Sequence, residues 1–221
     1  MTYQEVLANA RDPKNKCKAC PVCNGKACGN SMPGPGSKFP GNGAARNYEK
    51  WQEICVNMDT LCPNADPDVS FEMFGRKFTA PIFVAPLGAI DMHYGPKYKD
   101  IEYNSILIKA AYEYGLMALT GDGVNPAVIE ATAVALKKNN GCGVPTVKPW
   151  NIETVREKME LVKAADPFAI AMDIDAAGLP FLKNLTPPAG SKTVAELKEI
   201  AAAAEKPFIL KGIMTVKGAL K

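Results

Sequence analysis

The amino-acid sequence predicts an α/β protein of the TIM (β/α)8-barrel type, with about five of the eight β/α units present. From Ala80 onward, apolar runs rich in β-formers alternate with amphipathic helical segments. The runs are apolar on both faces, which is typical of a parallel sheet covered by helices, either an open doubly wound sheet or a barrel. Eight β/α units need roughly 250 residues, whereas Pro81 to Lys221 provides about 140.

The predicted strands are continuous apolar runs, and the predicted helices carry their apolar side chains on one face. The strands are expected at residues 81–86, 116–120, 144–147, 168–174 and 207–210. Helices are expected at 101–114 and at about 126–137, and a third begins after the N-cap Asn151 and turns Val155, Met159 and Val162 inward. A fourth opens with a capping box formed by Thr193 and Glu196.

Two elements and an extension precede the barrel segment. Residues 47–58 are expected to form a helix with Trp51, Ile54, Cys55 and Met58 on one face, and residues 71–78 a hairpin that turns at Gly75. The Gly/Pro-rich run Met32–Gly36 excludes a continuous helix or central strand. We therefore expect an irregular Cys/Gly/Pro-rich N-terminal extension at 1–45 and a partial barrel domain at 46–221.

Composition excludes several classes of protein. The net charge is +3 and the basic residues form no block, so nucleic acid is not an expected partner. No apolar run approaches the ~20 residues of a membrane span, and the N-terminus lacks the apolar core of a signal peptide. We expect a cytoplasmic protein that binds a small-molecule substrate and no membrane.

Polar residues follow the predicted strands at the edge where parallel α/β proteins bind ligands. The residues of interest are Pro86, Leu87 and Gly88 after the first strand, Thr120 and Gly121 after the second, Thr146 and Lys148 at the third, Asp173 and Asp175 at the fourth, and Lys211 at the fifth. Two lysines and two carboxylates are costly to bury unpaired, so we expect a polar ligand or mutual pairing. No Gly-rich fingerprint follows the first strand, which disfavours a nicotinamide cofactor.

Two of these stretches resemble a known family. Residues 80–86 (APIFVAP) and 207–215 (PFILKGIMT) are similar to the first and fifth barrel strands of FMN-dependent α-hydroxy-acid oxidases and dehydrogenases, such as glycolate oxidase and lactate oxidase. The resemblance covers residues 45–221. It implies an FMN-dependent oxidoreductase that acts on an α-hydroxy acid or a similar CH–OH substrate by hydride transfer to flavin N5.

The resemblance implies a role for each residue at the strand ends. The FMN contacts would be the backbone of Pro86, Leu87 and Gly88 beside the flavin ring, Thr120 and Gly121 in place of a Ser-Ser pair, Thr146 in place of a Gln, and Asp173 in place of a Thr. Lys211 matches a Lys near flavin N1 and O2, where a fixed ammonium stabilises the negative charge of the reduced ring. Lys148 replaces a substrate-binding Tyr, and Asp175 matches the Asp that orients the family's catalytic His.

The chain also departs from the family pattern. The Ser-Gly-His-Gly-Gly-Arg segment with the general base and the phosphate-binding glycines of the seventh and eighth strands do not occur, and His93 is expected to be a surface residue of the loop after the first strand. We expect the 221-residue chain alone to bind FMN weakly or not at all and to be inactive. Its exposed edge strands favour pairing with another chain, either a homo-oligomer or a second chain that supplies the rest of the barrel.

Four cysteines lie close together in the extension. Cys17, Cys20, Cys23 and Cys28 have the spacing C-x2-C-x2-C-x4-C, which is compatible with an iron–sulfur cluster, a structural zinc or unligated thiols. Two further functions remain open: an FMN barrel similar to type 2 isopentenyl diphosphate isomerase, in which Lys148 would face a diphosphate, and a non-catalytic metal-binding or partner module.

Overall fold

The computed structural model describes residues 1–14, 17–29 and 43–221. The chain forms two compact units: unit 1 contains Met1–Asp68 and Ile90–Tyr98, and unit 2 contains Val69–Ala89 and Lys99–Lys221. Unit 1 thus extends past the boundary expected at residue 45 and takes in a segment from the loop after the first barrel strand. The run Met32–Gly36 lies outside the described residues.

Unit 1 contains the short helices α1 (Tyr3–Ala10), α2 (Gly43–Gln52) and α3 (Ile90–Tyr94). A capping box of Thr2 and Glu5 starts α1, and the Tyr3 hydroxyl donates a hydrogen bond to the Pro21 carbonyl at 2.8 Å. His93 lies in α3, half-buried, with its ring edge-on to Tyr94, so the expectation of a surface loop histidine is wrong.

The predicted helix at 47–58 is only partly correct. Helix α2 begins earlier and ends at Gln52, and Ile54 to Met58 are not helical. A short helix in water depends on packing of its apolar face. Trp51, Ile54 and Met58 are exposed, so this face gains no burial that would extend the helix.

Unit 2 begins with the predicted hairpin, formed by β1 (Phe71–Met73) and β2 (Arg76–Phe78). The strands pair antiparallel, and the two turn residues Phe74 and Gly75 both have positive φ, at 51° and 74°. Two left-handed residues in a two-residue turn match the right-handed twist of the strands. Gly75 therefore turns the chain as predicted.

A parallel sheet of five strands in chain order forms the centre of unit 2. The strands are β3 (Phe83–Val84), β4 (Met117–Thr120), β5 (Val144–Val147), β6 (Ile170–Asp173) and β7 (Phe208–Lys211). Each pairs with the next strand of the sequence. This order confirms the predicted succession of β/α units and the partial barrel.

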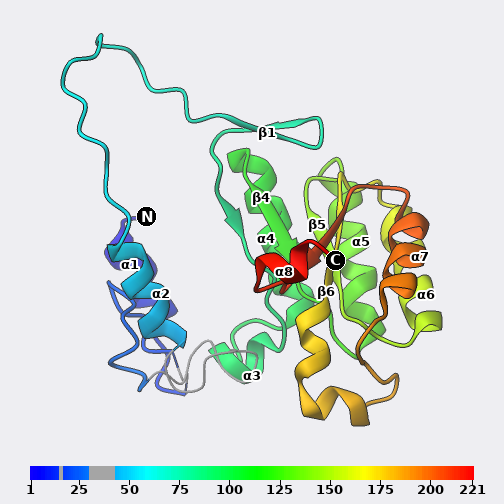
Figure 1. Ribbon diagram of the computed structural model, residues 1–221. Coiled ribbons are helices and arrows are strands. Elements are labelled where there is room, and N and C mark those ends of the chain that lie inside the picture. Colours follow the sequence, from blue (N-terminus) through cyan, green and yellow to red (C-terminus); the bar gives the residue numbers. More distant parts are fainter. Residues whose placement is uncertain (15–16, 30–42) are drawn as a thin grey trace. The chain divides into compact units, whose positions relative to one another are not determined.

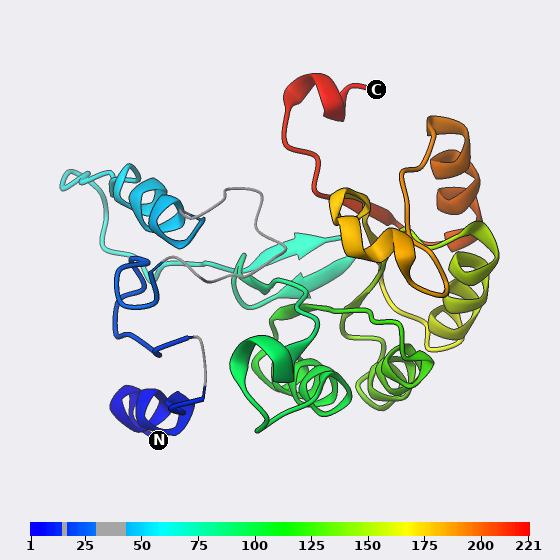
Figure 2. The ribbon, with the colours of Figure 1, turned by 90° about the horizontal axis from the view of Figure 1, so that it is seen from below.

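Four helices connect the strands and cover one face of the sheet: α4 (Asp100–Tyr114), α5 (Pro126–Lys138), α6 (Ile152–Lys163) and α7 (Val194–Ala204). They form a curved row outside the strands, from green to orange in Figure 2, and α5, α6 and α7 are also visible beside the sheet in Figure 1. The 3₁₀ turns η1 (Ile174–Gly178) and η2 (Pro180–Asn184) follow β6, and α8 (Val216–Ala219) ends the chain.

Of the two capped helix starts predicted in unit 2, one is confirmed and the other is not. The Thr193–Glu196 capping box opens α7 as expected. Asn151 precedes α6, but its side chain does not cap the helix. Instead the Asn151 amide group donates to the Glu153 carboxylate at 2.9 Å, and the Asn151 Oδ1 has no hydrogen-bond partner among the described residues.

The sheet has an inner face and a helix face. The inner face carries the buried side chains of Met117, Leu119, Val144, Ala169 and Ala171, and Phe78 of the hairpin packs against them. The helix face carries Val147, Ile170 and Met172, which pack against Val155, Met159 and Val162 of α6. The predicted inward face of α6 is therefore confirmed.

The first predicted strand is shorter than expected. Only Phe83 and Val84 pair with β4, although the apolar run spans 81–86. Pro81 and Pro86 have no N–H to donate, and β3 is an edge strand of this sheet. Ile82 and Phe83 are accordingly exposed, unlike the fully buried residues of β4 and β5.

Candidate functional site

Three charged side chains form a row across the C-terminal ends of β5, β6 and β7. Asp173 and Lys211 are direct cross-strand partners. Thr146 pairs with Ala171, so Lys148, two residues further on, is level with Asp173. Because side chains alternate along a strand, Lys148, Asp173 and Lys211 all belong to the inner face. We call these three residues the charged row.

The charged row is held together by ion pairs. Lys211 Nζ lies 2.7 Å from Asp173 Oδ1 and 3.4 Å from Asp175 Oδ1. Lys148 Nζ lies 3.8 Å from the other oxygen of Asp173. The side chains are 18–34% exposed, so solvent or a ligand can reach them. The expectation of mutual pairing among these lysines and carboxylates is therefore confirmed.

Electrostatics favours the charged forms of the central pair. Burial opposes ionisation of Asp173, but hydrogen bonds with Asp175 and Lys211 and the charges of Lys211 and Lys148 together place its pKa below the usual value. Burial likewise opposes the charge of Lys211, but the bond to Asp173 and the charges of both carboxylates raise its pKa. The row is thus a compact array of fixed opposite charges.

Asp175 supports the row from η1. Gly212, directly after Lys211, has φ of +99°, and a Cβ on it would lie 2.4 Å from the Asp175 Cβ. The chain therefore needs glycine here to let the Asp175 side chain approach the end of β7. In the described residues Asp175 contacts Lys211, so its implied role in orienting a histidine stays a prediction.

Below the charged row the inner face presents small groups. Gly121, Thr146 and Ala171 stand at one level of the sheet by register. A Cβ on Gly121 would lie 1.7 Å from the Leu87 carbonyl oxygen, and one on Gly88 would lie 3.3 Å from the Asp122 carbonyl oxygen. The backbone after β3 therefore crosses directly over the end of β4. We call this crossing of Leu87 and Gly88 over Gly121 the cradle.

Two threonines at the strand ends differ in direction. The hydroxyls of Thr120 and Thr146 are both buried and have no hydrogen-bond partner among the described residues. Thr146 belongs to the inner face with the cradle, whereas Thr120 pairs with Pro145 and belongs to the helix face. The hydroxyl of Thr120 is therefore directed away from the inner face. Thr120 can adjoin the cradle only through its main chain.

A buried polar network behind the row was not predicted. The Asp122 carboxylate accepts hydrogen bonds from the Lys158 ammonium and the Trp150 indole, both at 2.6 Å. On the same strand end, the Asn104 amide donates to the Gly121 carbonyl at 3.1 Å. These contacts fix the main chain after β4.

The sequence held a signal for Lys158. It lies between Val155, Met159 and Val162 on the buried face of α6, where a cation needs a buried anion as partner. Finding that anion required the fold, because Asp122 is separated from Lys158 by 36 residues.

The cysteines give no support to a metal site. In residues 1–14, 17–29 and 43–221, no three His, Cys, Asp or Glu side chains lie together so as to hold a metal ion. Cys17, Cys20, Cys23 and Cys28 form no disulfide. The Cys17 sulfur accepts a hydrogen bond from the Ala19 amide, and the Cys28 thiol donates to the Gly25 carbonyl. The predicted iron–sulfur or zinc ligation is therefore not supported.

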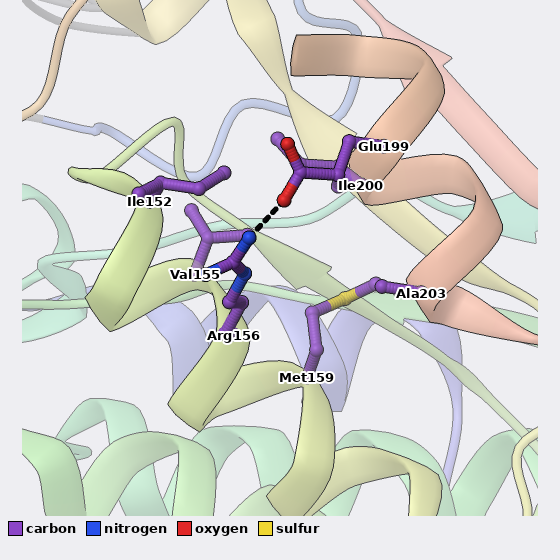
Figure 3. A pocket seen from close by; sticks show the side chains of 7 residues that line it. All are labelled: Ile152, Val155, Arg156, Met159, Glu199, Ile200 and Ala203. Atoms are coloured by element: carbon purple, nitrogen blue, oxygen red, sulfur yellow. Dashed lines mark hydrogen bonds and ion pairs between the residues drawn. The ribbon is translucent and has the colours of Figure 1, made fainter.

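A small pocket lies on the other side of the sheet, between α6 and α7 (Figure 3). Its walls are mainly apolar, and an ion pair between Arg156 and Glu199 bridges the two helices. The pocket includes no residue of the charged row or the cradle. Both side chains of the ion pair are more than half exposed, and the pocket adds nothing to the candidate site.

The sequence profile of the FMN-dependent dehydrogenase family matches residues 36–181. The match covers more than half of the chain, and the chain belongs to this family. No curated protein sequence matches the chain at a significant level. In the described part of the chain, no helix combines the length and apolar character needed to cross a membrane.

Solved structures of flavoenzymes share the fold. A putative lactate oxidase of Pediococcus acidilactici is 18% identical with a TM-score of 0.60, over 79% of this chain and 52% of that chain. A mandelate oxidase is 18% identical with a TM-score of 0.56, over 75% and 51%. A flavocytochrome b2 is 13% identical with a TM-score of 0.60, over 79% and 46%. The chain thus spans about half the length of these structures.

The tight crossing at Gly121 makes a testable prediction. We expect Gly121→Ala to lower the free energy of unfolding by about 2 kcal/mol or more, because the new methyl group meets backbone that cannot rotate away. Gly123→Ala is the control, since its Cβ would meet only Val128 at 3.8 Å and should change stability by about 0.5 kcal/mol or less. Urea unfolding measures both, and equal effects would contradict the cradle geometry.

The charged row makes a prediction about pH. We expect Asp173→Asn to lower the free energy of unfolding by about 1 kcal/mol near neutral pH, where Asp173 is ionised and bonded to Lys211. The folded-state pKa of Asp173 is depressed, so this stability is present above the ordinary aspartate pKa of about 3.9 and is lost as pH falls through the lower folded-state value.

The test is urea unfolding of both proteins from pH 2 to pH 8, for which the difference should shrink below about pH 4. Glu113→Gln is the control, because it breaks an exposed pair with Lys109 and should have a smaller effect. A difference between Asp173→Asn and the parent that persists undiminished in acid would refute the pairing.

Proposed function

We propose that the inner-face ends of β3 to β7 form the flavin-ring part of an FMN site. The whole protein would be an oxidoreductase that acts on an α-hydroxy acid or a similar CH–OH substrate. Membership of the FMN-dependent dehydrogenase family and the fold shared with flavoenzymes support this proposal. Bound FMN would supply the acceptor for the hydride that leaves the substrate carbon.

The observation that carries the proposal is the Thr146 hydroxyl. A buried hydroxyl without a partner costs free energy, and Thr146 has this defect on the inner face, one level below the charged row. A polar ring edge offers the missing partner. Gly121 and the backbone of Leu87 and Gly88 supply the flat surface that a planar ring requires.

The charges of the charged row also fit a flavin-ring site. Lys211 would place a fixed ammonium beside the ring edge that becomes negative on reduction, and Asp173 and Asp175 hold this ammonium. Lys148 would bind an anionic group of the substrate. Within the described residues its ammonium makes a single ion pair at 3.8 Å, so its hydrogen-bond donors remain available.

The rest of the site would come from further β/α units. A proton-accepting group and a binding site for the FMN phosphate would complete the barrel, since this chain covers only about half of the solved structures. Edge strands β3 and β7 offer unpaired backbone for those units, on one longer chain or between chains. The odd number of cysteines, seven, suits a reducing compartment such as the cytoplasm better than a disulfide scaffold.

The test compares Thr146→Val with Thr120→Val. We expect the 221-residue chain to bind FMN with a Kd of about 1 mM, and Thr146→Val to weaken this about tenfold by removing the hydroxyl that pairs with the ring. Thr120→Val serves as the matched control, because its hydroxyl is equally buried and unpartnered but belongs to the helix face. Isothermal titration measures the affinities.

Two further readouts sharpen the test. Both valine variants should be as stable as the parent or slightly more stable, since each removes an unsatisfied buried hydroxyl. Riboflavin should bind as well as FMN, because the residues proposed here contact the ring alone, and the chain should not oxidise lactate or glycolate. Equal flavin affinities for the two variants would overturn the proposed role of Thr146, and tight FMN retention with turnover would refute an incomplete site.

A further inference from the structure

A buried ion pair lies behind the charged row. Lys158 Nζ is 2.6 Å from Asp122 Oδ1, and the Asp122 carboxylate is fully buried while the Lys158 side chain is 7% exposed. The Lys158 ammonium also donates to the Gly123 carbonyl at 3.0 Å and lies 5.5 Å from the centre of the Trp150 ring. Neither side chain of this pair belongs to the charged row, and Asp122 adjoins the cradle through its main-chain carbonyl near Gly88.

The Asp122 carboxylate accepts two hydrogen bonds at each oxygen. Oδ1 accepts from the Gly123 amide at 2.8 Å and from Lys158. Oδ2 accepts from the main-chain amide of Lys148 at 3.0 Å and from the Trp150 indole at 2.6 Å. The second oxygen therefore fixes both ends of the segment 148–150 to the end of β4.

This segment carries Lys148 at its start. The residue stands just beyond β5, and Pro149 has no N–H to contribute. The main chain that follows is held by a bridge to residues 188–190, in which the Asn151 amide donates to the Pro188 carbonyl and the Gly190 amide donates to the Pro149 carbonyl, both at 2.9 Å. The bridge does not bond the Lys148 amide. In the described part of the chain the Lys148 ammonium has only the long ion pair to Asp173. The position of the side chain therefore depends on its main chain, and the Lys148 amide donates to the Asp122 side chain.

Stability alone does not account for this ion pair. Removing two charges from water is costly, and apolar residues of similar size often stabilise a core equally well. Four donors converging on one carboxylate instead specify a single geometry. An asparagine would present an NH2 group to two of these donors and could not satisfy the same set.

We propose that Asp122 is a positioning residue for Lys148. Its carboxylate fixes the main chain of 148–150 so that the Lys148 ammonium is held on the inner face beside Asp173, and Lys158 compensates the buried negative charge. The functional role of this positioning rests on the proposed function, in which Lys148 binds an anionic group of the substrate. The positioning itself can be measured without any ligand.

The test is competitive labelling of lysines with acetic anhydride, quantified by mass spectrometry. We expect Asp122→Asn to raise the reactivity of Lys148, relative to the exposed Lys109, by about threefold or more, because the Lys148 amide loses its charged acceptor and the ammonium moves away from Asp173. Val162→Ala is the matched control. It removes buried volume from the same helix as Lys158 but takes no hydrogen bond away from Asp122, and it should leave the ratio unchanged.

Tryptophan fluorescence reports whether the hydrogen bonds of Asp122 have changed. In a Trp51→Phe background, Trp150 is the sole tryptophan, and its emission should shift when the indole loses its bond to Asp122. If Asp122→Asn does not fold, Trp150→Phe takes its place. That variant removes one of the two donors at Oδ2 and should raise the Lys148 ratio about twofold.

The proposal is overturned if a folded Asp122→Asn variant with altered Trp150 emission keeps the parental Lys148 ratio. It is also overturned if Val162→Ala raises the ratio equally, or if the substitute Trp150→Phe leaves it unchanged. Because labelling needs neither flavin nor substrate, these outcomes are independent of flavin binding. Failure of the Thr146 test would leave the positioning of Lys148 intact, and the reverse also holds.

Discussion

The parallel register of β4 to β7 determines which side chains meet at the strand ends. Pairing of Asp173 with Lys211 and of Thr146 with Ala171 places alternate residues of each strand on the inner face. A shift by one residue on β6 would turn Asp173 toward the helices and leave two lysines without their shared carboxylate. The buried helix-face packing of Ile170 and Met172 opposes that shift, so the hydrophobic core also fixes the charges of the site.

The charged row and the hydrogen bonds of Asp122 are two sets of polar contacts with different roles in this arrangement. The charged row is partly exposed, and its ion pairs leave hydrogen-bond donors available to a ligand. The contacts of Asp122 are buried and complete, so they act on the main chain rather than on a ligand. The Thr146 hydroxyl, one level below the charged row on the inner face, is buried and lacks a partner among the described residues. A preorganised binding site requires a rigidly held main chain and polar groups that can bond a ligand.

Local patterns were sufficient to predict most of unit 2. The apolar runs gave the strands, and Thr193 with Glu196 gave the start of α7, because strand burial and helix capping depend on neighbouring residues. The strand-end residues could be named, but their pairings depend on register. The Asp122–Lys158 contact joins distant segments and was missed. Where tertiary burial was absent, as at Ile54 and Met58, periodicity alone predicted too long a helix.

The most direct test of the flavin site is a titration of the 221-residue chain with FMN, followed at each backbone amide by NMR. At millimolar FMN, the proposed site predicts the largest shifts at the ends of the strands, around Gly88, Gly121, Thr146 and Lys211. The amides of α6 and α7 that line the pocket in Figure 3 should remain unchanged. Shifts concentrated at that pocket or in unit 1, or no shifts at all, would contradict a flavin-ring site on the inner face.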